Sequence, residues 1–218
     1  MTRRLSLSSE GRAVSVYLHR HDLPEDVRFS GHVAIDTEAM GLDHGRDRLC
    51  LVQLSDGGDH IHLVQILPGA APPERLMRVL GDAKALKLLH FARFDIAMIQ
   101  KQFGLLMAPV YCTKIASKLA RTYTDRHGLK DVVKELLGRD VSKEQQSSDW
   151  GADQLGDSQL LYAAADVLHL HALKERLDAI LIREGRMALA QACFDFLPTR
   201  ALLDLAGWPD IDIFSHSS

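Results

Sequence analysis

Short runs in which apolar and polar residues alternate fill much of the first ninety positions, and short turns separate them. This period of two is typical of strands with one buried face. The alternating runs predict strands within 14–24, 32–38, 48–56, 60–66 and 85–91. Because the connecting turns are short, we expect the first strands to form an antiparallel meander. Residues 1–13 show no periodicity, so we expect a mobile N-terminal extension there.

Helical periodicity takes over later in the chain, where apolar residues recur every three or four positions. The predicted helices lie within 72–82, 94–104, 110–121, 127–138, 157–186 and 187–197, the third of them after a strand end. Asp157 is the expected N-cap of the long helix. Strands first and helices later predict one α/β domain over 14–197, with a central mixed sheet flanked by helices. A C-terminal arm at 198–218 follows it.

The composition fits one globular domain. Of the 218 residues, 46% are hydrophobic, which is enough for one substantial core. The net charge of −3 lacks the basic excess of proteins that grip long nucleic acids, so we expect a small or local nucleic-acid footprint. Three widely separated cysteines indicate neither a disulfide framework nor a zinc site. No run resembles a membrane span or a signal peptide, so we expect a cytoplasmic protein without a membrane partner.

Asp36 and Glu38 interrupt an otherwise apolar strand. On a strand, residues i and i+2 point to the same face, so both carboxylates aim at one spot. Left unpaired, they would repel each other and lose hydration. The pair alone does not distinguish a cation site from an exposed strand end, or from salt bridges to Arg46 or Arg48.

Three more residues extend this pattern. Asp95 stands at a boundary of strand and helix, while Tyr162 and Asp166 share a helix face at i and i+4. Taken singly, Asp95 could be a helix N-cap and Asp166 a solvated residue. With Asp36 and Glu38 they form a set of four carboxylates that could converge. Such oxygen ligands suit Mg²⁺ or Mn²⁺, and two of these ions can activate water against a phosphodiester.

The motifs DTE, HFARFD and YAAAD resemble, in order and spacing, the three exonuclease motifs of the DEDD superfamily, over roughly residues 25–185. The tyrosine of the third motif is typical of the DEDDy branch, and the chain is similar to its ribonuclease D group. The resemblance implies a ribonuclease H-like fold and a two-metal 3′–5′ exonuclease activity. It assigns the metals to Asp36, Glu38, Asp95 and Asp166, and implies that Tyr162 orients the attacking water.

Three further segments, at 110–131, 145–151 and 196–208, look like the short ribonuclease D-like nucleases of the NrnC or nanoRNase C group. That resemblance implies an exoribonuclease for very short RNA, down to dinucleotides, and a ring-shaped homo-octamer. Two other interpretations stay open. One is an exonuclease for longer RNA or DNA, and the other is a non-catalytic nucleic-acid-binding module.

Substrate contacts near the acids are hypotheses about single residues. The backbone around Thr37, the turn at Gly41 and the side chain of Leu42 are candidates for the 3′ nucleotide. Leu42 could equally anchor its loop in the core. Phe94 could stack on a base, although core packing is the stronger interpretation. His90 is a candidate contact that we expect mainly to pack and hydrogen-bond.

Two polar segments, 124–131 and 143–150, could bind phosphate. Their candidate residues are Arg126, His127, Lys143, Gln146 and Ser148. A cap on the 5′ phosphate would explain a preference for dinucleotides, because longer chains would clash with it; two solvated loops are the alternative. In the segment 198–218, irregularly spaced apolar residues fit either a subunit contact or an arm packed on its own domain.

Overall fold

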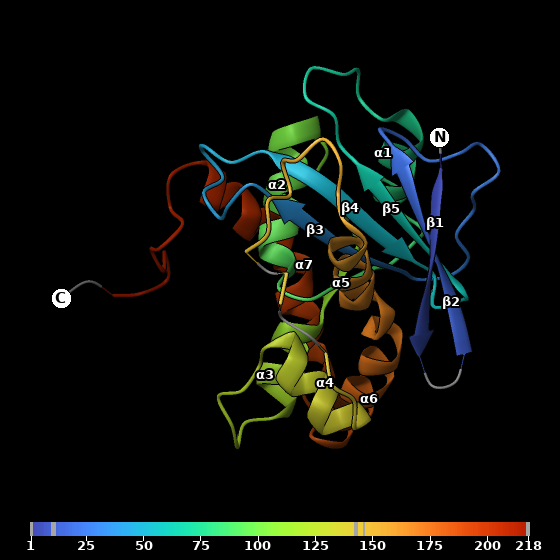
Figure 1. Cartoon of the computed structure of the whole chain (residues 1–218). Coiled ribbons are helices and arrows are strands. Elements are labelled where there is room, and N and C mark those ends of the chain that lie inside the picture. Colours follow the sequence, from blue (N-terminus) through green and yellow to red (C-terminus); the bar gives the residue numbers. More distant parts are fainter. Residues whose placement is uncertain (1, 10–11, 142–143, 146, 217–218) are drawn as a thin grey trace.

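The structure, a computed structural model, describes residues 2–9, 12–141, 144–145 and 147–216. Within these residues one seven-stranded mixed sheet runs in the order β1-β2-β5-β4-β3-β6-β7 (Figure 1). The strands are β1 Arg3–Ser9, β2 Arg12–Arg20, β3 Val33–Ala39, β4 Leu49–Ser55, β5 His60–Gln65, β6 Lys87–Leu89 and β7 Val110–Cys112. The helices are α1 Glu74–Leu80, α2 Ala92–Phe103, α3 Thr113–Ala120, α4 Leu129–Leu137, α5 Asp157–Leu168, α6 Leu170–Arg183 and α7 Met187–Leu205. This is the predicted architecture of a mixed sheet flanked by helices.

Strand pairing follows the prediction at the centre of the sheet and departs from it on one side. β3, β4 and β5 form the expected antiparallel run. β2 joins β5 in parallel, so the meander prediction is wrong for the strand within 14–24. A parallel pair needs a long crossover, and the chain forms β3 and β4 before it returns to β2. On the other side β3, β6 and β7 are all parallel, so their carboxyl ends lie at one edge.

The N-terminal segment is an edge strand. Residues 3–9 form β1, which pairs antiparallel with β2, so the mobile extension predicted for 1–13 is wrong for these residues. Leu5 and Leu7 alternate with polar residues and pack, partly buried, against the core. Arg3 adds a hydrogen bond to the carbonyl of Leu155 and an ion pair with Asp157. Two leucines among charged and hydroxyl residues are too short a pattern to predict a strand.

Helices cover both faces of the sheet. α5 packs across β1 to β5, while α2 contacts β3, β4, β6 and β7 and α7 packs against α2 (Figure 1). The single helix predicted at 157–186 divides at His169 into α5 and α6. Gly156 is the N-cap of α5, so the N-cap role predicted for Asp157 is wrong. Among the described residues, no helix combines the length and the apolar character that a membrane span needs.

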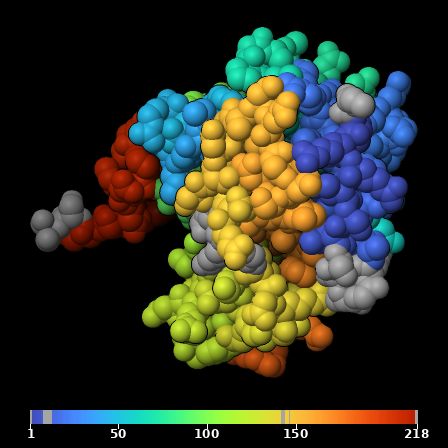
Figure 2. All heavy atoms as spheres, in the orientation of Figure 1, coloured from blue at the N-terminus to red at the C-terminus, as the bar shows by residue number. Residues whose placement is uncertain are grey.

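The last helix is longer than predicted. α7 continues through Pro198 to Leu205, so the expected start of an arm at 198 is wrong. Phe194, Leu197 and Ala201 form a buried stripe along α7, and this packing against α2 outweighs the cost of the proline. The chain beyond the helix leaves the body of the molecule, as the red segment in Figures 1 and 2 shows.

Candidate active site

Three of the predicted metal ligands converge on one point. Asp36 and Glu38 lie on one face of β3, and Asp166 projects from α5, which packs on that face. One carboxylate oxygen from each lies within 4.8 Å of the other two. The register between β3 and β4 shifts just after Glu38, and such bulges re-aim side chains beside functional sites.

Asp95 reaches this region from the other face of the sheet. Thr37 lies between Asp36 and Glu38 and therefore points away from them, and its hydroxyl donates a 2.7 Å hydrogen bond to Oδ1 of Asp95. Asp95 is 3% exposed and belongs to the first turn of α2. Phe91 is the N-cap of that helix, so Asp95 does not have the N-cap role that was its alternative. Asp95 thus borders the cluster of three carboxylates.

Burial is the largest of the causes that raise the pKa of all four acids. Burial is the first cause for Asp36, whose pKa lies well above its usual value, and for Glu38, whose pKa rises to about 9. Repulsion from neighbouring carboxylates is the second cause for both. The pKa of Asp95 rises to about 7 through burial, against the hydrogen bond from the threonine. That of Asp166 also rises to about 7, against a hydrogen bond from Tyr162.

A divalent cation fits this donor set. The ligand atoms are hard carboxylate oxygens, which suit Mg²⁺ or Mn²⁺. A bound cation would offset the repulsion and the lost hydration that raise these pKa values. The arginines considered as partners of Asp36 and Glu38 are engaged elsewhere. Arg46 pairs with Asp47, and Arg48 donates to backbone carbonyls.

Tyr162 lies one helical turn before Asp166 and hydrogen-bonds to its carboxylate. Burial, followed by the charges of the neighbouring carboxylates, raises the pKa of this phenol further above its ordinary value. The phenol therefore stays protonated near neutral pH and cannot serve as a general base, but its O–H group can orient a water molecule. The buried indole of Trp150 packs against it, with 6.1 Å between ring centroids. This contact holds the segment after 144 beside the carboxylates.

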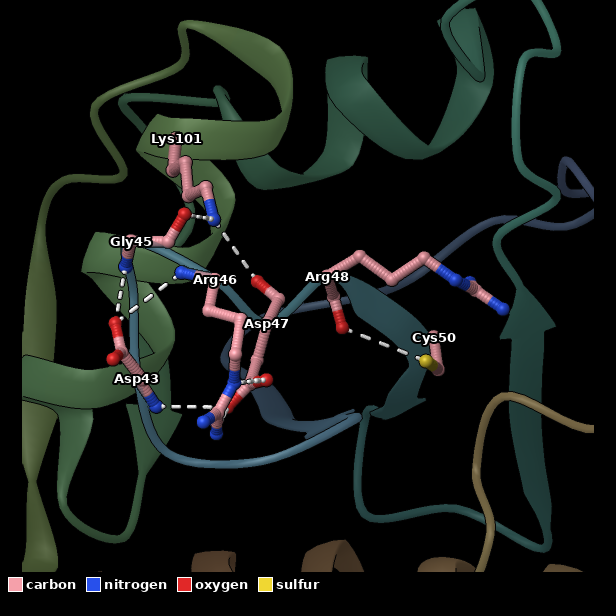
Figure 3. A network of polar contacts seen from close by, with 7 residues as sticks. All are labelled: Asp43, Gly45, Arg46, Asp47, Arg48, Cys50 and Lys101. Atoms are coloured by element: carbon pink, nitrogen blue, oxygen red, sulfur yellow. Dashed lines mark hydrogen bonds and ion pairs between the residues drawn. The ribbon is translucent and has the colours of Figure 1, made fainter.

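The loop after β3 is built around one carboxylate (Figure 3). Asp47, which is 6% exposed, accepts hydrogen bonds from the backbone N–H of Asp43 at 3.0 Å and from Nε of Arg46 at 2.8 Å. Lys101 of α2 donates to two backbone carbonyls of the loop. A Cβ atom on Gly41 would lie 2.2 Å from the carboxylate of Asp47, so only glycine fits there.

This rigid loop presents apolar side chains to solvent. Leu42 is 82% exposed and Met40 is 58% exposed. Leu42 therefore does not anchor the loop in the core, which was its alternative role. Two side chains of this kind, held next to Glu38 and open to solvent, are suited to contact a ligand rather than the core.

The edge formed by β6 and β7 continues the site away from the carboxylates. His90 follows β6, and its Nδ1 lies 2.9 Å from the hydroxyl of Thr113, which follows β7. Burial, followed by the charge of Lys114, lowers the pKa of His90 to about 3, and the nearby backbone of His127 opposes the shift. His90 is thus a neutral, packed side chain. His90 lies between the end of β6 and the segment that contains His127.

A buried arginine shapes that segment. Arg121 has a fully buried side chain that donates to the hydroxyl of Ser117 at 2.9 Å and to the carbonyl of Arg126 at 2.7 Å. It also pairs with Glu135 of α4. The hydroxyl of Ser117 lies 2.9 Å from Nδ1 of His127. These contacts leave the side chain of Arg126 exposed and hold His127 half-buried.

The remaining candidates are less well placed. Phe94 is half-buried, with its ring 5.1 Å from that of His44, which favours the packing interpretation. Ser148 is half-buried in the segment that Trp150 anchors. Lys143 and Gln146 lie outside the described residues.

Sequence reasoning missed three side chains at this site. Gln53 pairs with Asp36 across β3 and β4 and donates to its Oδ2 at 3.2 Å, a contact that only the strand register reveals. Phe91 and Lys114 lie together at the sheet edge, with the ammonium 4.3 Å from the ring centroid. A left-handed backbone is usually marked by glycine or asparagine, so nothing in the sequence singled out Phe91.

Comparisons with known proteins agree with this geometry. A family model described as 3′–5′ exonuclease matches residues 19–182. Ribonuclease D of Gluconacetobacter diazotrophicus is 36% identical over 163 residues, which are 75% of this chain and 41% of that relative. Brucella melitensis NrnC bound to pGG has a TM-score of 0.89 and 52% identity, over 93% of this chain and 98% of that chain. The same protein with bound Mg²⁺ gives 0.88 and 51%, over 93% and 99%.

The residues matched by the family model contain all four acids of the site and its tyrosine. This chain spans less than half the length of the ribonuclease D relative, whereas it covers nearly all of the NrnC chains. The fold is the ribonuclease H-like exonuclease fold of these neighbours. The chain belongs to the 3′–5′ exonuclease family.

Proposed function

We propose that this chain is a metal-dependent exoribonuclease that hydrolyses dinucleotides to nucleoside 5′-monophosphates. The convergence of Asp36, Glu38 and Asp166 within 4.8 Å, with Asp95 beside them, carries this proposal. All four acids and Tyr162 are present, so the alternative of a non-catalytic binding module has no support. Two ions, Mg²⁺ or Mn²⁺, would be held by the four carboxylates. When bound, they supply water activation and neutralise charge on the phosphodiester.

Three further residues would position the water and the substrate. Tyr162, held protonated beside Asp166, orients the water for attack on phosphorus while the bond to the 3′ oxygen breaks. Thr37 fixes Asp95 through its hydroxyl. We assign the backbone of Thr37 to the 3′-terminal sugar. Leu42, exposed on the rigid loop, is placed to wedge against the terminal base.

Support for a short substrate comes from both sides of the acids. The NrnC structure contains pGG, whose name denotes two guanosine nucleotides with a 5′ phosphate, and this chain covers nearly all of that protein. On one side of the site Trp150 holds its segment against Tyr162. On the other, His127 lies beside His90. We assign the 5′ phosphate to the segment with Arg126 and His127, which would leave little room for further nucleotides.

The test is a length series of 5′-phosphorylated RNAs of two to ten nucleotides, compared by kcat/KM. We expect the dinucleotide to be cleaved fastest. Asp166→Asn is the matched control, and we expect it to lower the rate by about 10³-fold or more, because metal stabilisation of the transition state is worth several kcal/mol. Equal rates across the series would instead favour an exonuclease for longer RNA or DNA.

We further propose that the chain assembles into a homo-oligomer, an octamer by its similarity to NrnC, through its C-terminal tail. Arg200 holds the carbonyls of Trp208 and Pro209 at 3.0 and 2.9 Å, and the ring of Phe214 lies 5.8 Å from that of Phe196 on α7. Ile211 is 55% exposed and Phe214 is 77% exposed, as is typical of residues that meet a partner. Deleting residues 210–218, which leaves α7 intact, should lower the mass measured by light scattering. An unchanged mass would reject this role.

A further inference from the structure

Phe91 has a backbone conformation that its side chain does not favour. It follows β6, caps α2 and has φ 70° and ψ 40°, in the left-handed region. Phenylalanine is strained in this region, and glycine or asparagine would avoid most of that strain. Strain of this kind persists where the surrounding structure imposes it, and it is concentrated at ligand sites.

Core packing does not explain the ring. Phe91 is 45% exposed, whereas Phe94, in the same motif, is half-buried against His44. The contact that the ring does make is polar. The ammonium of Lys114 lies 4.3 Å from its centroid, which is a cation–π distance. The ammonium lies over one face of the ring, which is nevertheless 45% exposed, so the ring can still stack on a planar group of a ligand that also carries a negative charge.

The position of this pair relative to the carboxylates follows from the sheet. β3, β6 and β7 are adjacent and parallel, so Asp36 and Glu38, in the carboxyl-terminal half of β3, lie toward the same edge as Phe91, which follows β6, and Lys114, which follows β7. Phe91 lies one helical turn before Asp95, which Thr37 ties to the catalytic strand. The pair is therefore the next surface along the edge from the cleavage point.

We propose that Phe91 and Lys114 form the platform for the base of the 5′ nucleotide, the one that remains after the terminal nucleotide is released. The base stacks on the phenyl ring, and the lysine ammonium lies near the phosphate that joins the two nucleotides. Purines, with their larger π surface, bind better than pyrimidines. This inference rests on the proposed function, since it assigns a subsite of the same reaction.

The experiment compares wild type, Phe91→Ala, Phe91→Asn and Phe91→Tyr on two dinucleotides. One carries adenine on its 5′ nucleotide, and the other is abasic there. Loss of base stacking should raise KM for the adenine substrate about tenfold in Phe91→Ala and Phe91→Asn, with little change in kcat. KM for the abasic substrate should stay unchanged in all variants, and Phe91→Tyr should retain wild-type KM on both.

Two results would overturn the inference. One is an equal rise in KM for both substrates, and the other is a fall in oligomeric mass on light scattering, which would make Phe91 a subunit contact. Asparagine tolerates the left-handed backbone, so Phe91→Asn should fold even if Phe91→Ala does not. If wild type fails to cleave any dinucleotide, the proposed function fails. If wild type cleaves both substrates and the variants change KM for both by the same factor, only the platform fails.

Discussion

Two groups of buried charge lie close together at α2 and are built in opposite ways. Asp204 of α7, whose side chain is 1% exposed, accepts hydrogen bonds from Nε and Nη2 of Arg93 at 2.5 and 2.6 Å and pairs with Arg200 at 3.2 Å. Asp36, on β3, has three other acids around it and accepts a hydrogen bond from the neutral amide of Gln53 at 3.2 Å. The first group carries its counter-ions within the chain.

The difference indicates what each group is for. Arg93 and Asp204 stabilise the packing of α7 on α2, and the hydrogen bond to the carboxylate of Asp204 raises the pKa of Arg93. The carboxylates around Asp36 lower the stability of the metal-free fold, because burial and repulsion both oppose their ionised form. A chain retains such an arrangement when a ligand supplies the missing charge.

Replacing one acid in each group with its amide tests most directly whether the two groups contribute differently to stability. At pH 8 without metal, Asp204→Asn should lower the free energy of unfolding by about 3 kcal/mol, since it leaves two arginines without their carboxylate. Asp36→Asn should raise it by about 1 kcal/mol, because one pKa unit of relieved repulsion is worth that much. Urea unfolding in EDTA measures both changes.

The two substitutions control for each other, since both replace a buried carboxylate with an amide of the same shape. A loss of stability in Asp36→Asn as large as that in Asp204→Asn would show that the carboxylates of the site are already compensated.

The carboxylate site could be predicted from the sequence as far as it depends on local geometry. Strand periodicity places Asp36 and Glu38 on one face, and helical periodicity places Tyr162 and Asp166 together. The resemblance to the exonuclease motifs then placed these two pairs, together with Asp95, in one site. Arg93 lies inside the second motif, yet its partner Asp204 is 111 residues away. Pairing at that distance depends on how α7 packs, which no periodicity records.

The errors have the same physical origin. β1 is a strand because Leu5 and Leu7 pack against the core. α7 continues past Pro198 because Phe194 and Ala201 pack against α2. In both places tertiary contacts override a weak or unfavourable local signal.

A smaller effect is expected in the pH dependence of metal binding at the carboxylates. The pKa of Asp95 and Asp166 is about 7 in the folded chain, above the ordinary 3.8, so the metal-free fold binds protons that the unfolded chain does not. Their contribution to stability is therefore greatest at low pH and is lost as the pH rises through about 7. Mg²⁺ must displace these protons, so it binds more tightly at high pH.

The rise in melting temperature caused by a fixed Mg²⁺ concentration should accordingly grow from pH 6 to pH 9. When Mg²⁺ reaches 100 times its dissociation constant, it stabilises the fold by about 2.7 kcal/mol, and at pH 6 the gain should be a small part of that. Thermal unfolding with Mg²⁺ and with EDTA at each pH measures the difference. Asp36→Asn should abolish most of the rise, because it removes a ligand from the cluster of three. A rise of the same size at every pH would mean that the carboxylates are already ionised without metal, and that the fold tolerates their charge by means other than a bound cation.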